Sequence, residues 1–314
     1  MNKVRRITLR GGGLTAQVLT LGAIVQDLRL EGVTHPLVLG SPDPADYLGR
    51  ARYFGAMIGR FANRIGGARF DLDGATCRTD PNFLGRHTLH GGADGADAQI
   101  WQVEALAGDS VTLTLTLPDG HMGFPGEIRM RAEILLSDGA LNFTLSAESD
   151  APTPCNLTHH GFFDLDGQGD IRGHWLRIAA DHYLPVDSDL IPTGQIAPVA
   201  GTAFDFRAAR VIGTAGYDHN FCLSDGPRPL RPVAWLTGES GLSMRVETTA
   251  CGLQFYDGAY MRDVPGLEGR RYGPHAGLAL ETQHWPDAPN RPGFPDAILR
   301  PGREYRETTR YVFG

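Results

Sequence analysis

The chain has 314 residues, of which 41% are hydrophobic and 21% are charged, the proportions of a folded protein rather than a disordered one. Its 36 acidic side chains outnumber its 29 basic ones and give a net charge of -7, so we expect no nucleic acid and no anionic membrane as partner. Lys3 is the only lysine, and its place near the N-terminus excludes a Schiff-base lysine and a Walker-type phosphate loop.

Neither the N-terminus nor the cysteines indicate secretion. Residues 1–13 are basic but lack an apolar stretch long enough for a signal peptide or a transmembrane helix. The four cysteines are far apart and form no CxxC motif, so we expect buried free thiols at Cys77, Cys155, Cys222 and Cys251. Together these features predict a cytoplasmic protein.

Much of the chain carries the pattern of half-buried β-strands. Apolar and polar residues alternate over 110–117, 128–134 and 141–147, and the turn signal at 137–139 (SDG) precedes the third segment. These three segments predict an antiparallel meander. Helical periodicity is confined to a short stretch around Asp46 to Arg52.

The distribution of turn-forming residues indicates the fold class. The 41 glycines and 21 prolines are spread along the whole chain, which has no linker-like segment and no repeat of fixed period. So many strands must close into a barrel or stack into two sheets to hide their edges. We therefore predict an all-β fold, a large antiparallel β-sandwich, and a single domain over residues 1–314, since all-β domains are often this long.

One carboxylate near the C-terminus has an unusual setting. Glu281 follows an apolar run, in the segment LETQHWPDAPNRPGFP over 280–295, and the four prolines after it predict a rigid loop rather than a central strand. At the junction of strand and loop, a half-buried Glu281 would have a raised pKa, as a general base needs. The alternative is a structural carboxylate that accepts hydrogen bonds from the loop amides.

Six segments combine polar residues with glycines or aromatics. They are 59–65 (GRFANRI), 87–92 (HTLHGG), 156–165 (NLTHHGFFDL), 181–194 (DHYLPVDSDLIPTG), 216–221 (GYDHNF) and the Glu281 loop. In this order they resemble the aldose 1-epimerase, or galactose mutarotase, family over the chain from residue 59 to its end. The resemblance implies a galactose mutarotase-like supersandwich and an isomerase that interconverts the α and β anomers of a free aldose sugar.

That reaction needs a base and an acid on either side of one sugar. The base removes the proton of the C1 hydroxyl while the acid protonates the ring oxygen, and the open aldehyde then rotates before it closes again. Ordinary pKa values of about 4.3 and 6.5 would allow Glu⁻ and His⁺ to coexist near neutral pH. The resemblance implies that Glu281 is the base and His160 the acid, and that no metal, cofactor or covalent intermediate is required.

The resemblance also implies a set of substrate-binding residues. His90 matches a second active-site histidine, and the two glycines after it permit close backbone approach to a ligand. Asn63 and Arg64 match a pair whose arginine bonds substrate hydroxyls. Asp218 matches the carboxylate that accepts hydrogen bonds from the distal hydroxyls, and Gln254 matches a further contact.

Three residues depart from the pattern of the family, and one apolar contact is expected. His159 stands where Asn is usual, and it either lowers the pKa of His160 by repulsion or points away on the other face of the strand. Asp164 and Asp257 either shift the sugar preference or have no effect. Either Phe162 or Trp285 is expected to pack against the C–H face of the sugar.

Other functions remain as alternatives. A cupin-like metal site could use His87, His90, His159 and His160, although their spacing does not match HxH followed by Glu.

A hexose-6-phosphate 1-epimerase would share the fold but needs clustered arginines, for which the candidates are Arg50, Arg52, Arg270 and Arg271. A non-catalytic sugar-binding protein of the same fold is a third alternative. A glycoside hydrolase would need a second carboxylate, and Asp218 is the only obvious one. The identity of the sugar, and a monomer or a homodimer, are left open.

Overall fold

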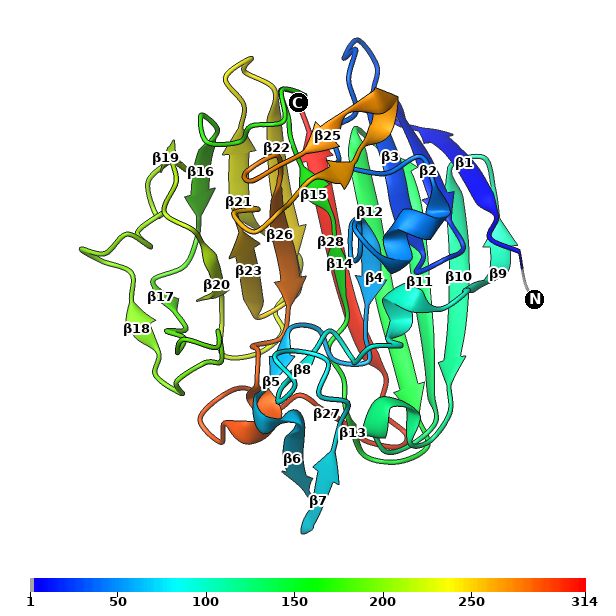
Figure 1. The fold of residues 1–314 in the computed structure, drawn as a ribbon, viewed down its shortest axis with the longest axis vertical. Helices are drawn as coiled ribbons and strands as arrows, with labels where there is room; N and C mark the ends of the chain where they lie inside the picture. Colours follow the sequence, from blue (N-terminus) through cyan, green and yellow to red (C-terminus); the bar gives the residue numbers. More distant parts are fainter. Residues whose placement is uncertain (1–2) are drawn as a thin grey trace.

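The computed structural model describes residues 3–314, and β-strands dominate it (Figure 1). The larger of two main sheets has nine antiparallel strands, in the order β19 (Arg210–Val211), β16 (Trp175–Ile178), β21 (Arg231–Thr237), β22 (Ser243–Thr248), β28 (Tyr305–Phe313), β12 (Ala140–Ser149), β11 (Ile128–Ser137), β10 (Ser110–Leu117) and β9 (Gln102–Leu106). The second has six, in the order β15 (Phe162–Phe163), β26 (Leu278–Gln283), β23 (Gly252–Tyr256), β20 (Asp218–Cys222), β17 (His182–Tyr183) and β18 (Ala197–Pro198).

Smaller elements surround these two sheets. A three-stranded sheet is formed by β1 (Arg6–Gly11), β2 (Leu14–Leu19) and β3 (Ile24–Leu30). Five two-stranded pairs are β4 (Ala56–Ile58) with β14 (Thr158–His160), β5 (Arg64–Ile65) with β8 (Thr88–Leu89), β6 (Arg69–Leu72) with β7 (Ala75–Arg78), β13 (Thr153–Pro154) with β27 (Ile298–Leu299), and β24 (Val264–Pro265) with β25 (Arg271–Tyr272). The helices are short 3₁₀ turns: η1 (Pro44–Leu48), η2 (Gly66–Ala68), η3 (Ala96–Ala98), η4 (His121–Gly123), η5 (Leu267–Gly269) and η6 (Ala288–Asn290).

The predicted meander is confirmed by β10, β11 and β12. Each pairs antiparallel with the next, and the register sets Leu113 opposite Ala132 and Ala132 opposite Leu145. Apolar residues of these strands are buried, while most of the alternating polar ones remain partly or fully exposed. One face of the nine-stranded sheet is therefore exposed to solvent, and its other, apolar face must pack against further elements that cover it.

The cover comes from the other two sheets. The six-stranded sheet contacts the nine-stranded one where Thr282 of β26 hydrogen-bonds Thr309 of β28 at 2.5 Å, and where the Tyr311 hydroxyl donates to the Leu280 carbonyl at 3.2 Å. Strand β1 packs on β10 and β11 at the other end. Buried apolar side chains from all three sheets form one continuous core, so the molecule is the predicted antiparallel sandwich.

The structure also tests several local predictions. The four cysteines are free thiols, as predicted, but only Cys155 and Cys251 are buried, and the expectation of burial is wrong for Cys77 and Cys222, which are partly exposed. The helical stretch around Asp46 to Arg52 is shorter than expected, because only η1 forms and turns follow it. Strand β26 ends at Gln283 and the proline-rich segment is a loop, but Glu281 lies inside the strand and is 2% exposed rather than half-buried. Within residues 3–314 no helix has the length and apolarity to cross a membrane.

Candidate active site

A cleft of about 590 Å³ opens beside the six-stranded sheet, within the range of about 300–1,000 Å³ typical of ligand sites. Six predicted site residues line it: Asn63, Arg64, His90, His160, Asp218 and Glu281. The seventh, Gln254, joins the cleft through a hydrogen bond to Asp218. The structure thus gathers all seven polar residues that the sequence nominated for catalysis or sugar binding.

Strand register aligns three of these polar side chains on one face of the sheet. Gln254 of β23 lies directly opposite Glu281 of β26, and Asn220 of β20 lies directly opposite Gln254. Because alternate residues of a strand share a face, Asp218 points the same way as Asn220. A carboxylate, an amide and a second carboxylate therefore follow one another across adjacent strands.

Asp218 is fixed by two partners. Arg64 Nη2 lies 3.0 Å from Asp218 Oδ2, and Gln254 Nε2 donates to Oδ1 at 2.6 Å. The Arg64 guanidinium in turn lies 4.9 Å from the centroid of the Phe83 ring, a cation–π distance. Each carboxylate oxygen keeps a further lone pair, so Asp218 can accept hydrogen bonds from ligand hydroxyls without moving.

Two consecutive histidines of β14 face opposite ways. His160 lines the cleft, whereas His159 stacks on Phe143 in the core with ring centroids 4.3 Å apart. Burial lowers the pKa of His159 to about 3, so this ring stays neutral. Of the two sequence interpretations of His159, the one in which it points away is confirmed. Repulsion between two charged imidazoles does not arise.

His90 is held by a reciprocal pair of hydrogen bonds with Asn63. The backbone N–H of Asn63 donates to the ring Nδ1 of His90 at 3.1 Å, and the backbone N–H of His90 donates to the backbone carbonyl of Asn63 at 2.9 Å. Because Nδ1 accepts, the proton of the neutral ring lies on Nε2. Both residues have left-handed backbones, with φ of 53° at His90 and 64° at Asn63, a strain of about 1–3 kcal/mol that persists mainly where function requires it.

The two glycines after His90 lie against other parts of the protein. A Cβ on Gly91, whose φ is +85°, would lie 2.3 Å from the Gly59 carbonyl oxygen. A Cβ on Gly92 would meet the Met122 side chain at 2.8 Å. The absence of a side chain at these two positions therefore makes room for neighbouring parts of the protein.

Glu281 and His160 form a buried acid–base pair. His160 Nε2 lies 3.5 Å from Glu281 Oε1, and their side chains are only 7% and 3% exposed. Burial raises the pKa of Glu281 well above its usual value, and the negative charge of Asp218 adds to the effect. Burial also lowers the pKa of His160 to about 4. Both shifts favour protonated Glu281 with neutral His160, so the expected Glu⁻ and His⁺ are not the preferred forms in this setting.

The pair has a third close neighbour in His90. Ligand-type atoms of His90, His160 and Glu281 all lie within 4.8 Å of one another, a grouping that a metal ion could in principle bridge. The four histidines considered for a cupin-like site do not gather, because His159 lies in the core and His87 Nε2 contacts Asp189 at 3.1 Å. The cupin-like metal hypothesis based on these four histidines is therefore wrong.

The aromatic lining is settled in favour of Phe162. Phe162 lines the cleft with its ring centroid 5.0 Å from that of His160. Trp285 packs on Phe294 at 5.1 Å and donates its Nε1–H to the Cys251 carbonyl at 2.9 Å. Trp285 belongs to a separate apolar cluster, so its assignment to the sugar is wrong.

Two of the departures from the family pattern organise loops. Their carboxylates accept backbone N–H bonds: Asp164 from Asp166, Gly167 and Gly169, and Asp257 from Gly216, Tyr217 and Ala259. Both are buried, and neither lines the cleft. Their effect on the sugar can only be indirect.

Sequence reasoning missed part of the cleft wall. The overlooked residues are Tyr53, Phe54, Phe83, Tyr260, Met261, Arg262 and Val264. Tyr53 and Phe54 directly precede β4, which pairs with β14 and so sets them beside His160. The available signal was the RYFG segment shortly before GRFANRI, but Arg52 is its only charged residue, and it has none of the histidine, asparagine or aspartate residues that identified the six segments.

Comparison with known proteins identifies the family. A family model described as aldose 1-epimerase matches residues 5–312. Galactose mutarotase from Mus musculus is 40% identical over 323 residues, which cover 99% of this chain and 94% of that protein. Aldose 1-epimerase from Escherichia coli (strain K12) is 39% identical over 331 residues, which cover 98% and 95%. The chain belongs to the aldose 1-epimerase family.

Solved structures agree with this assignment. An aldose epimerase homologue from C. elegans has a TM-score of 0.93 at 28% identity, with 99% of each chain covered. Galactose 1-epimerase from Lactobacillus acidophilus NCFM has a TM-score of 0.87 at 28% identity, with 100% of this chain and 95% of that chain covered. The predicted galactose mutarotase-like sandwich and the predicted isomerase class, that of the mutarotases, are thereby confirmed.

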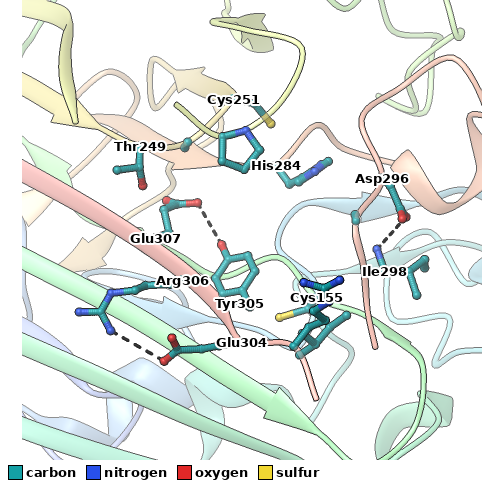
Figure 2. Close-up of a pocket in the computed structure, with 15 residues that line it drawn as sticks. Cys155, Thr249, Cys251, His284, Asp296, Ile298, Glu304, Tyr305, Arg306 and Glu307 are labelled. Carbon is teal, nitrogen blue, oxygen red and sulfur yellow. Dashed lines mark hydrogen bonds and ion pairs between the residues drawn. The ribbon is translucent and has the colours of Figure 1, made fainter. Parts of the chain in front are cut away.

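A second, smaller cavity of about 250 Å³ contains titratable groups of its own (Figure 2). Glu307 of β28 accepts a hydrogen bond from the Tyr305 hydroxyl at 2.9 Å, and His284 and Cys251 line the same space. Burial raises the pKa of the Cys251 thiol to about 12 and lowers the pKa of His284 to about 4. The thiol stays protonated near neutral pH, so the cavity lacks an activated nucleophile.

The buried carboxyl of this cavity generates a prediction about stability. Burial raises the pKa of Glu307 from its usual 4.5 to about 8 in the folded protein. Its contribution to stability is therefore complete below about pH 4.5 and is lost as pH rises through about 8. We expect Glu307→Gln, which removes this titration, to gain roughly 2–5 kcal/mol relative to wild type between pH 5 and pH 9. Thermal unfolding at both pH values measures the change, and a pH-independent difference would contradict it.

Proposed function

We propose that this protein interconverts the α and β anomers of a free aldose, with Glu281 as the base and His160 as the acid. The observation that carries the proposal is the buried contact of 3.5 Å between His160 Nε2 and Glu281 Oε1 in a cleft of suitable size. Family membership supports the same reaction. An acid and a base this close can both reach the anomeric end of one sugar.

Ring opening transfers one proton through the sugar. Glu281 takes the proton of the C1 hydroxyl, the bond between C1 and the ring oxygen breaks, and His160 protonates the ring oxygen. The aldehyde then rotates, and the same two residues reverse their roles as the ring closes on either face. The pair thus begins ring opening as an ion pair and ends it as protonated Glu281 with neutral His160.

The distal hydroxyls have their own partners in the proposal. Asp218, fixed by Arg64 and Gln254, accepts hydrogen bonds from them, and Asn63 and Arg64 supply donors nearby. Gln254 acts mainly through Asp218. Such prearranged polar groups orient a sugar without the cost of ordering them at binding.

The arginines favour a free sugar over a hexose 6-phosphate. Arg270 and Arg271 contact the carboxylates of Glu268 and Asp263. Arg52 lines the cleft but lies 3.1 Å from buried Asp97, and the exposed Arg50 is the remaining candidate. A phosphate dianion needs several uncommitted cations together, and these arginines do not provide them.

Replacement of the proposed base tests the central assignment. We expect Glu281→Gln to slow anomer exchange by about 10²- to 10⁴-fold because the amide cannot take the C1 proton, while sugar binding remains measurable. His160→Ala should also slow exchange severely. NMR exchange spectroscopy over a panel of free aldoses and hexose 6-phosphates provides the rates.

A matched control separates chemistry from general damage. Glu148→Gln makes the same change at an exposed position of β12, outside the cleft, and should keep the wild-type rate. Full activity in Glu281→Gln would refute the role of the base. Exchange of phosphorylated sugars alone would instead support a hexose-6-phosphate epimerase, and sugar binding without exchange in wild type would support a binding protein.

The shifted pKa values predict a broad pH profile. The active pair holds one proton, which it loses at a pH above the usual range of a carboxyl because burial raises the pKa of Glu281. On the acid side it gains a second proton at about pH 4, the lowered pKa of His160. We therefore expect kcat/KM to be bell-shaped, with an acid limb near pH 4, after subtraction of spontaneous mutarotation. An acid limb at the ordinary histidine value of about 6.5 would contradict this account.

Asp218 should act on binding more than on turnover. We expect Asp218→Asn to raise KM by roughly 10- to 100-fold, because it removes charge-assisted hydrogen bonds, while kcat falls much less. Asp225→Asn provides the control, since the Asp225 side chain is 85% exposed and pairs with Arg228 on the surface. Unchanged KM with abolished kcat in Asp218→Asn would move Asp218 from binding into the chemistry.

A further inference from the structure

Tyr53 lies beside two histidines of the cleft. Its ring centroid is 4.6 Å from that of His90 and 6.0 Å from that of His160, and its side chain lines the cleft. The backbone ties it to the same place, because the Gly55 N–H donates to the His160 carbonyl at 2.9 Å. Tyr53 therefore lies in a turn that is hydrogen-bonded to the backbone of His160, the proposed acid.

The hydroxyl of half-buried Tyr53 contrasts with those of five other buried or half-buried tyrosines. The hydroxyls of Tyr47, Tyr217, Tyr256, Tyr305 and Tyr311 each hydrogen-bond to other groups of the protein. Within residues 3–314 nothing hydrogen-bonds the Tyr53 hydroxyl, and only burial and nearby charges affect its pKa. A polar group held in a cleft wall without a protein partner is available to a ligand.

The backbone of Tyr53 is strained as well. Its φ of 72° lies in the left-handed region, which is uncommon for a bulky aromatic residue. The same left-handed region is occupied by Asn63 and His90, which also line the cleft. Strain at three residues around one site indicates that the positions of their side chains matter for function.

We propose that Tyr53 is a further catalytic residue, whose hydroxyl donates a hydrogen bond to the anomeric end of the sugar. This inference rests on the proposed function. The recipient is the oxygen on C1, on which negative charge develops as Glu281 removes its proton. A donor fixed at such a point stabilises the transition state more than the bound sugar.

Burial and one neighbouring cation suit Tyr53 to this role. Burial raises its pKa to about 12, so the phenol keeps its proton and remains a donor throughout the neutral range. The Arg52 guanidinium carbon lies 4.9 Å from the ring centroid, and a cation over the ring strengthens the hydroxyl as a donor. Arg52 is itself anchored to Asp97 at 3.1 Å.

Loss of one hydroxyl tests the inference. Tyr53→Phe keeps the ring and its contacts with His90 and His160 but removes the donor. We expect kcat for the best free aldose to fall about 10- to 100-fold with KM within twofold of wild type, measured by NMR exchange. Tyr53→Ala, which also removes the ring, should be slower still.

The controls distinguish this inference from the function on which it rests. Tyr183→Phe removes a phenol outside the cleft and should leave both constants unchanged. If wild type exchanges anomers but Tyr53→Phe matches it, or only raises KM, the role of Tyr53 is refuted and the mutarotase function stands. If wild type exchanges no aldose, the proposed function fails first. Thermal unfolding of Tyr53→Phe close to that of wild type ensures that a slow rate reflects chemistry.

Discussion

Desolvation of the pair formed by Glu281 and His160 is the constraint on which the site depends. Both side chains are almost fully buried, so an ion pair between them is costly and the neutral pair is preferred. In the proposed reaction, the neutral pair accompanies the open-chain sugar and the ion pair accompanies the closed ring. Burial therefore lowers the free energy of the open-chain complex relative to the closed-ring complex. Spontaneous ring opening is uphill in free energy, so this effect of burial favours the unfavourable step.

The sandwich supplies the rigidity that this arrangement needs. On one side, the register of β20, β23 and β26 sets Asp218, Gln254 and Glu281 on one face. On the other side, tight turns with left-handed residues present Asn63 and His90. Strand β14 delivers His160 between them. Hydrogen bonds within the wall, above all those to Asp218, hold the groups before any sugar arrives.

Sequence reasoning predicted correctly the features that depend on residues close together in the chain, and it missed those that depend on contacts between distant segments. The strands β10 to β12 were predictable because burial of one face imposes alternation on neighbouring residues. The polar site residues were found from motifs. The choice between Phe162 and Trp285, and the part of the wall around Tyr53, depend on packing between distant segments that local patterns do not encode. The preferred protonation of Glu281 and His160 likewise depends on burial, and ordinary pKa values gave the opposite answer.

The placement of acid and base on separate elements also has a consequence for folding. Strands β9 to β12 follow one another along the chain and pair with close neighbours in sequence. The elements that carry His160, Glu281, Asp218 and Arg64 come from distant segments and meet only when the sheets stack. Contacts of long sequence separation close slowly, since they carry the larger loss of chain entropy. In refolding, the meander should thus regain its structure before the chain regains its activity, and enzymatic recovery would report the final docking of the sheets.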